Sequence, residues 1–284
     1  MQTLNQIKYL RAALNADKNR GSKVVLVPTM GNLHEGHLQL VRRAREVADI
    51  VVVSIFVNPM QFGESEDLDS YPRTLTEDQD KLDAENVDYL FIPDAQEIYP
   101  NGIDNHTVVA NPSLSNMLCG IHRPQHFQGV CTIVNKLLNL VQPSVAVFGE
   151  KDFQQLAIVK RMASDLCMPI DIIGVPTARS HDGLALSSRN QYLSNIDRVK
   201  APFIYETLQK TRDAIVAGSK QYGTLCETAK INLKSAGFDV DYFDIRNQKN
   251  LDLLDNNDSD TAVVILAAAT LGKTRLLDNI KVSV

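Results

Sequence analysis

The fold is decided by two apolar runs, Lys23-Val24-Val25-Leu26-Val27 and Ile50-Val51-Val52-Val53-Ser54-Ile55-Phe56-Val57, and by the segment between them. Continuous apolar runs rich in β-branched residues predict strands that are covered on both faces. Between the runs, apolar side chains recur at helical spacing, namely Leu38, Val41, Ala44 and Ala48. The stretch therefore predicts a strand, a helix and a second strand, joined in a βαβ unit.

The same alternation of short strands and longer helices continues outward from this unit. Further buried strands are predicted at residues 88–92, 145–148 and 172–176. The alternation predicts an α/β domain over residues 1–176 with a doubly wound, Rossmann-like parallel sheet and ligands at the carboxyl ends of its strands. Strand candidates at residues 242–246 and 262–266, among helical stretches, predict a smaller α+β domain over residues 177–284.

The bulk properties are those of an ordinary folded, slightly acidic chain. Hydrophobic residues make up 44% of its 284 residues and charged residues 22%, and the net charge of −5 disfavours a nonspecific grip on nucleic acid. The N-terminus lacks the pattern of a secretory signal, and the longest apolar stretch, residues 262–271, is about half of the roughly 20 residues that span a bilayer. The four cysteines lack metal-ligand spacing, which predicts reduced thiols: Cys119, Cys131, Cys167 and Cys226. We therefore expect a cytoplasmic protein whose partners are small molecules, neither nucleic acid nor membrane.

The loop after the first strand carries the first candidate site. Its glycines have the spacing of a P-loop, Gly31-x-x-x-x-Gly36, but His37 stands where a P-loop has lysine, which excludes a Walker A motif. What remains is His34 and His37 near a helix N-terminus, where free backbone N–H groups and about +0.5 of dipole charge attract phosphate. Imidazole N–H groups can add to such a phosphate site. Taken alone, such a pair is more often two surface residues than a site. It could also be a metal half-site, but it lacks the His-Glu-x-x-His spacing of a zinc protease helix.

Three later segments could also carry chemistry. Gly149-Glu150-Lys151-Asp152-Phe153-Gln154-Gln155 follows another predicted strand, so that Lys151 can reach phosphate and Gln155 can bind a polar substrate. Leu186-Ser187-Ser188-Arg189 lies in a polar, mobile-looking loop and ends in a cation that can clamp phosphate. Residues 120–129 combine basic groups and glycines, and they fit an anion site and a plain turn equally well.

These motifs resemble those of known families. His34-Glu35-Gly36-His37 resembles the His-x-Gly-His motif of the nucleotidyltransferase superfamily, in which the histidines contact ATP, and residues 186–189 resemble its short Ser-Lys-Ser type segment. Most of the chain resembles the pantothenate synthetase family, the pantoate–β-alanine ligases. The resemblance extends through Val27-Pro28-Thr29-Met30-Gly31, Ser54-Ile55-Phe56-Val57-Asn58-Pro59-Met60-Gln61-Phe62, Tyr71-Pro72-Arg73-Thr74 and Arg275-Leu276-Leu277-Asp278-Asn279. Gln128 departs from the pattern where many relatives have arginine, which leaves the role of its loop undefined.

The resemblance implies a two-step ligase reaction. The carboxylate of (R)-pantoate attacks the α-phosphate of ATP and pyrophosphate leaves. The amine of β-alanine then displaces AMP from the pantoyl adenylate, which gives pantothenate. The resemblance also implies Mg²⁺ beside ATP and a homodimeric protein, and it leaves any protein ligands of the metal undefined.

Individual roles are implied motif by motif. ATP would be held by Met30, Gly31, Asn32, Leu33, His34, Glu35, Gly36, His37, Gly149, Glu150, Lys151, Asp152, Ala178, Leu186, Ser187, Ser188 and Arg189. His37 would be the proton donor, and the other catalytic groups would be His34, Lys151, Ser187, Ser188 and Arg189. Pantoate would be held by Gln61 and Gln155, and β-alanine by Gln61 and Tyr71. Glutamines suit this task because they bind oxygen atoms without neutralising the attacking carboxylate.

Two rival functions share some of these features. A nucleotidyltransferase that transfers AMP to a phosphorylated coenzyme precursor would keep the nucleotide on its product. A noncatalytic zinc-binding or nucleotide-sensing module would use His34 and His37 as metal ligands. The identity of the products separates the ligase from the first rival, and activity with Mg²⁺ alone after chelation separates it from the second.

Overall fold

The structure is a computed structural model that describes residues 1–63, 68–254 and 262–282. The chain divides into two compact units. The first unit comprises Met1–Glu150 and Ile158–Pro176, and the second comprises Lys151–Ala157 and Thr177–Val284. The assignment of nucleotide and pantoate binding to residues 1–176, and of an ATP-closing loop to residues 177–284, stays a prediction.

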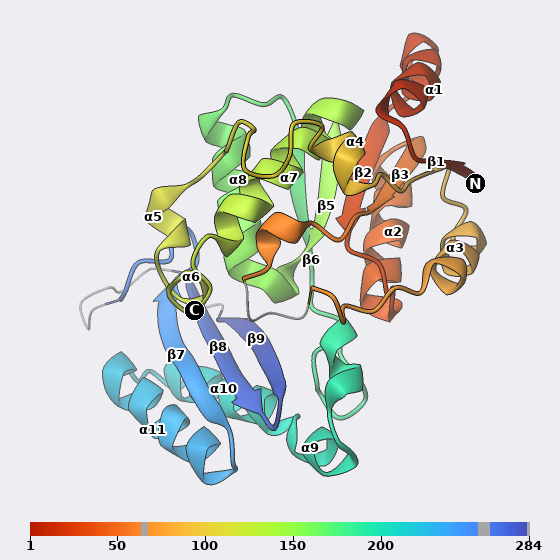
Figure 1. Cartoon of the computed structure of the whole chain (residues 1–284). Helices are drawn as coiled ribbons and strands as arrows, with labels where there is room; N and C mark the ends of the chain where they lie inside the picture. The colour runs from red at the N-terminus through yellow and green to blue at the C-terminus, as the bar shows by residue number, and fades with distance from the viewer. Residues whose placement is uncertain (64–67, 255–261, 283–284) are drawn as a thin grey trace. The chain divides into compact units, whose positions relative to one another are not determined.

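The first unit is built around a six-stranded parallel sheet, which confirms the predicted doubly wound α/β fold (Figure 1). Its strands are β1 (Gln2–Leu4), β2 (Val24–Thr29), β3 (Ile50–Ile55), β4 (Tyr89–Phe91), β5 (Val145–Gly149) and β6 (Asp171–Val175). Their order across the sheet is β1-β4-β3-β2-β5-β6. Strand β1 was not predicted, because its three residues carry too little apolar pattern.

The direction of winding reverses at β2, and in doubly wound folds ligands bind at this switch point. From β2 the chain moves outward to β3 and β4, and it then returns to β5 on the other side of β2. Val25 pairs with Val145, and continuing that register places Thr29, the last residue of β2, beside Gly149, the last residue of β5. The segments that follow these two strand ends are those that carry the histidine pair and Lys151.

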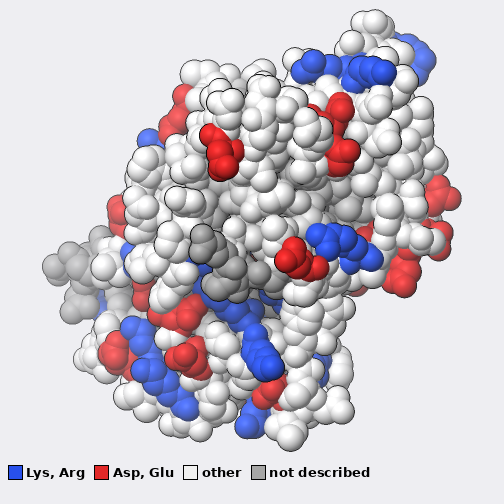
Figure 2. Space-filling model, in the orientation of Figure 1, with Lys and Arg blue, Asp and Glu red and all other residues white. Residues whose placement is uncertain are grey.

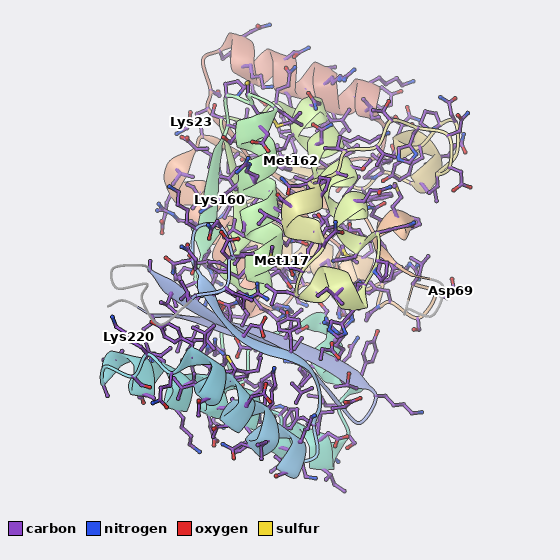
Figure 3. The ribbon with its side chains drawn as sticks, turned by 90° about the vertical axis from the view of Figure 1, so that its left-hand side faces the viewer. Lys23, Asp69, Met117, Lys160, Met162 and Lys220 are labelled. Carbon is purple, nitrogen blue, oxygen red and sulfur yellow. The ribbon has the colours of Figure 1, made fainter. Side chains whose placement is uncertain are left out.

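The helices of the first unit are α1 (Ile7–Asn19), α2 (Glu35–Val47), α3 (Leu75–Ala84), α4 (Ala95–Ile98), α5 (Pro112–Ser115), α6 (Cys119–His122) and α7 (His126–Val141), with the 3₁₀ helix η1 (Pro59–Gln61). The 3₁₀ helix η2 (Glu150–Asp152) begins in this unit and ends in the second. Helix α2 packs on β2, β3 and β5, and α7 packs on β2. Helix α2 buries Leu40, Val41 and Ala44 against the strand valines, and each such burial contributes roughly 1.5–3 kcal/mol for a valine or leucine. Helix α8 (Phe153–Asp165) has residues in both units. It buries Met162 and exposes Lys160, both labelled in Figure 3.

The second unit has a three-stranded antiparallel sheet, β7 (Asp239–Asn247), β8 (Val263–Leu271) and β9 (Thr274–Val282), in the order β7-β8-β9. Its helices are η3 (Ser188–Tyr192), α9 (Asn195–Lys200), α10 (Phe203–Val216) and α11 (Tyr222–Ser235). Helix α11 packs on β7 and α10 packs on β8 and β9 (Figure 1). The two predicted late strands correspond to β7 and β8, which are longer than predicted, whereas β9 was not predicted.

The surface carries charges of both signs. In the face shown in Figure 2, Lys and Arg alternate with Asp and Glu, and basic residues gather over α1 at the top. Lys8 and Arg11 of that helix are exposed. No helix within the described ranges is both long enough and apolar enough to cross a bilayer.

Candidate active site

The chain reverses sharply where β2 ends, and this reversal requires glycine. Gly31 (φ +82°) and Asn32 (φ +50°) are both left-handed, a conformation that glycine adopts without strain. A Cβ on Gly31 would also lie 3.1 Å from Cγ2 of Ile55 and 3.3 Å from Oδ2 of Asp78. The N–H of Gly31 donates to Oγ1 of Thr29 at 3.3 Å. The turn is therefore fixed by local contacts before the first histidine.

The two histidines form the N-cap of α2, which confirms that they lie at a helix N-terminus. The N–H of Gly36 donates to Nδ1 of His34 at 3.2 Å, and the N–H of His34 donates to Nδ1 of His37 at 3.3 Å. This is a capping box built from imidazoles, with the ring centroids 4.1 Å apart. Because each Nδ1 accepts a hydrogen bond, a neutral ring carries its proton on Nε2. The box thus sets the tautomer of both rings and makes Nε2 their donor atom.

Several backbone N–H groups of this loop already have hydrogen-bond partners. The N–H groups of Asn32 and Leu33 donate to the carboxylate of Asp78 at 2.8 and 2.7 Å, and those of His34 and Gly36 donate to imidazole nitrogens. The expectation of free backbone donors is therefore wrong for these four residues. The Nε2 atoms of the two imidazoles are further donors that this loop can offer to a phosphate.

Gln61 is held in one orientation by Asn58. The Nδ2 group of Asn58, which is fully buried, donates to Oε1 of Gln61 at 3.2 Å and to the carbonyl of Gly129 at 3.1 Å. Oδ1 of Asn58 accepts from the hydroxyl of Tyr99 at 2.8 Å, and burial raises the pKa of Tyr99 to about 12. With its oxygen engaged, the amide of Gln61 offers its NH₂ group to a ligand, as a carboxylate or hydroxyl oxygen requires.

The sequence of residues 120–129 fits an anion site and a plain turn equally well. In the structure this segment contacts the backbone carbonyl of Gln61. Its Arg123 donates to the carbonyl of Gln61 at 3.2 Å, and Nδ1 of His126 lies 2.8 Å from the same oxygen. A Cβ on Gly129 would lie 2.3 Å from the carbonyl oxygen of Met60, so only glycine allows α7 to approach η1 this closely. A role in anion binding stays a prediction.

Tyr71 contacts the residue that follows Gln61. Its ring packs edge-on against Phe62, the residue after Gln61, with centroids 5.8 Å apart. Tyr71 is 7% exposed. The structure thus places the two residues predicted for β-alanine around the same short segment of chain.

In the second unit, Lys151 is fixed by the last strand. The carbonyl of Lys151 accepts from Nδ2 of Asn279 in β9 at 2.8 Å. Its side chain is 18% exposed, with Nζ 3.8 Å from Oδ1 of Asp152. Gln155, in the first turn of α8, is partly exposed. Both side chains are accessible enough to meet a ligand.

The loop that carries Ser187, Ser188 and Arg189 is held by hydrogen bonds at its base, and its mobility stays a prediction. The N–H of Leu186 donates to the carbonyl of Ala178 at 2.9 Å. Arg179 forms a two-pronged ion pair with the buried Asp278 of β9, at 2.6 and 2.8 Å, and also donates to the carbonyl of Gly183 at 3.0 Å. Oγ of Ser187 accepts from the N–H of Arg189, which lies in the first turn of η3. The loop is therefore anchored at its base to the same strand that holds Lys151.

The sequence analysis did not predict the supporting roles of three residues: Asn58, Asp78 and Arg179. A signal existed for Asp78, because it stands four residues before the buried Leu82 and so lies on the inner face of α3, an unusual place for a carboxylate. No such signal marked Arg179, whose partner is 99 residues away.

The fold and these loops together define a class of protein. A doubly wound sheet with a glycine- and histidine-bearing turn and a helix N-terminus at its switch point is typical of α/β proteins that bind a nucleotide or a similar phosphate ligand. More specifically, residues 2–281 match the family model described as Pantoate-beta-alanine ligase, and the chain belongs to that family. Membership of the wider nucleotidyltransferase superfamily stays a prediction.

Individual relatives match along the whole chain. A pantothenate synthetase of Marinobacter nauticus is 51% identical over 283 residues, which covers 100% of both chains. The crystal structure of pantothenate synthetase from Thermus thermophilus superposes with a TM-score of 0.91 at 42% identity, over 99% of each chain. That of pantoate-beta-alanine ligase from Francisella tularensis, complexed with beta-gamma ATP and beta-alanine, gives 0.82 at 34% identity, over 99% of this chain and 97% of that one. These matches confirm the resemblance seen in the motifs.

Proposed function

We propose that the protein condenses (R)-pantoate with β-alanine to pantothenate, through a pantoyl adenylate, with release of pyrophosphate and AMP. Its family supports this activity. The structural observation that carries the proposal is the imidazole capping box, because it presents two Nε2–H donors just after the end of β2. The alternative, transfer of AMP to a phosphorylated coenzyme precursor, is not favoured by this family.

The first step requires stabilisation of the leaving pyrophosphate. Pantoate's carboxylate oxygen bonds to the α-phosphorus of ATP as the bond to the bridging oxygen breaks, and negative charge grows on the leaving group. We propose that His34 and His37 donate to it, with His37 the proton donor, and that Lys151 and Arg189 add positive charge. Such preorganised donors are often the largest contribution to catalysis.

The two glutamines would select the acid. The NH₂ group of Gln61, fixed by Asn58, would donate to an oxygen of pantoate, and Gln155 would hold a second polar group. In the second step the amine of β-alanine, placed by Gln61 and Tyr71, attacks the acyl carbon, loses a proton and displaces AMP. Ser187 and Ser188 would help to keep water from the adenylate, which hydrolyses readily.

The remaining residues predicted for ATP are proposed to line its site. They are Met30, Gly31, Asn32, Leu33, Glu35, Gly36, Gly149, Glu150, Asp152, Ala178 and Leu186. The described ranges contain no group of three or more His, Cys, Asp or Glu side chains that could hold a metal ion. Mg²⁺ would accompany ATP and neutralise phosphate charge, and this ion usually binds substrate phosphates together with only one or two carboxylates. A homodimer in the cytoplasm is also proposed.

Exchange of labelled pyrophosphate into ATP tests this function. The exchange is expected only when pantoate is present, and it should need no β-alanine, because the adenylate forms before the amine reacts. With both substrates, AMP and pyrophosphate should appear in equal amounts. Formation of ADP and phosphate, or AMP retained on the product, would contradict the proposal.

Gln61→Glu tests the choice of acid. The variant is expected to raise KM for pantoate by roughly tenfold or more, because a hydrogen bond to a charged group contributes about 1.5–3 kcal/mol and a second carboxylate would repel the first. KM for ATP should stay unchanged, as should both constants in the control Gln96→Glu, whose side chain is exposed. An unchanged pantoate KM in Gln61→Glu would remove this residue from the acid site.

A further inference from the structure

The carboxylate of Asp78 in α3 is buried and accepts hydrogen bonds from the backbone of the histidine loop. It is 1% exposed. Its Oδ1 accepts from the N–H of Leu33 at 2.7 Å and from Oγ1 of Thr74 at 3.3 Å, and its Oδ2 accepts from the N–H of Asn32 at 2.8 Å. A carboxylate accepts two such N–H groups at once only when they converge, so these bonds select one path for the loop.

A second contact from the same helix grips the same peptide. Nζ of Lys81, one turn after Asp78, donates to the carbonyl of Leu33 at 2.8 Å. Leu33 is thus held at its N–H by Asp78 and at its carbonyl by Lys81, directly before His34. Its side chain is 3% exposed and packs in the core of the first unit. Helix α3 therefore fixes the residue from which the capping box starts.

The backbone here needs such support. A non-glycine residue in the left-handed region costs on the order of 1 kcal/mol and persists only where its surroundings determine it. Asn32 is in that region and follows Gly31, which is left-handed too. The carboxylate that holds Asn32 also lies 3.3 Å from where a Cβ of Gly31 would stand. Asp78 is thus in contact range of both left-handed residues.

Electrostatic attraction does not explain why a carboxylate lies at this position. A buried negative charge beside a phosphate-binding loop opposes the binding of ATP, and burying it costs free energy unless its hydrogen bonds are satisfied. Its contribution must therefore lie in geometry. We propose that Asp78 is a positioning residue for adenylate formation, acting through the loop on His34 and His37, an inference that rests on the proposed function.

Asp78→Asn is the variant that tests this. Asparagine has nearly the same shape, but its NH₂ group would face one of the two N–H groups and leave that donor unsatisfied. Because a misplacement of about 1 Å can cost about 10²-fold in rate, we expect pyrophosphate exchange to fall about tenfold. The reaction of preformed pantoyl adenylate with β-alanine should stay within about twofold of wild type, because the leaving pyrophosphate plays no part in it.

The matched control is Asp80→Asn, the same change at a more accessible position of the same helix, and it should leave both half-reactions unchanged. Combining Asp78→Asn with His37→Ala should slow exchange by less than the product of the two single losses, because part of the effect of Asp78 acts through His37. If Asp78→Asn fails to fold, Lys81→Met removes the other contact to Leu33 and should show the same selective loss.

Three results would overturn the inference: normal exchange in Asp78→Asn, an equal loss in both half-reactions, or a lower KM for ATP, which would mean that only the charge matters. Absence of pantoate-dependent exchange in the wild-type enzyme is a different outcome. It would overturn the proposed function, and this inference with it.

Discussion

An enzyme in which His37 is replaced by alanine is expected to turn over about 10² times more slowly than wild type while keeping its fold. The change removes the Nε2–H donor proposed for the leaving pyrophosphate. It also removes the Nδ1 acceptor for the N–H of His34, and losing a cap of this kind costs about 1 kcal/mol. Turnover of the variant and its free energy of unfolding, measured by urea denaturation, are the two readouts.

His37→Asn separates the two effects. The short amide can still accept from the backbone of His34, as asparagine does at helix caps, but it cannot reach as far as Nε2. We expect this variant to regain most of the lost stability and little of the lost activity. Wild-type turnover in either variant would remove His37 from the mechanism.

Asp278→Ala is expected to lower the free energy of unfolding by about 3–5 kcal/mol, the range found when one partner of a buried ion pair is removed. The carboxylate is 3% exposed and accepts from two nitrogens of Arg179 and from the N–H of Asn279 at 2.7 Å. Burial raises the pKa of Asp278, and Arg179 opposes this by lowering it, with burial the larger effect. The pair therefore stabilises little in net terms, but breaking it leaves the guanidinium without its carboxylate partner.

A matched pair of variants checks that reasoning. Asp213→Asn, in an exposed ion pair with Arg212 of the same unit, should change stability by less than about 1 kcal/mol. Replacing both partners, with Arg179→Met and Asp278→Leu, should recover much of the stability lost in Asp278→Ala, because no buried charge is left unpaired. Equal losses in the buried and the exposed single variants would show that the pair does not anchor its loop.

The sheet was predictable from the sequence because its strands are buried on both faces. A run such as Val51-Val52-Val53 needs no knowledge of its partners to be assigned to a strand, and the structure confirms it as part of β3. Strand β9 was missed for the opposite reason. Asp278 and Asn279 interrupt its apolar pattern, and their burial is explained only by partners far away in the sequence, Arg179 and Lys151.

The residues of the candidate site also divide into those that local sequence predicts and those that depend on distant partners. The histidine pair could be found because both residues lie on one short loop after a strand. Their mutual capping was not predicted, because histidine is not among the residues that commonly cap helices. Asp78 was not predicted either, since its acceptor role depends on N–H groups 45 and 46 residues away. Local pattern identifies the groups that are proposed to meet the ligand, whereas long-range contacts determine what holds them.

The imidazole capping box limits how stable the start of α2 can become. Serine followed three residues later by glutamate is the usual form of this box, and serine is among the best caps. At positions 34 and 37 that exchange would preserve the helix, yet it would replace two ring donors by a hydroxyl and a negative charge beside the proposed phosphate site. The protein therefore has a less stabilising N-cap than it could have, at the place where the chemistry is proposed. Selection for thermal stability alone would be expected to drive these two positions away from histidine.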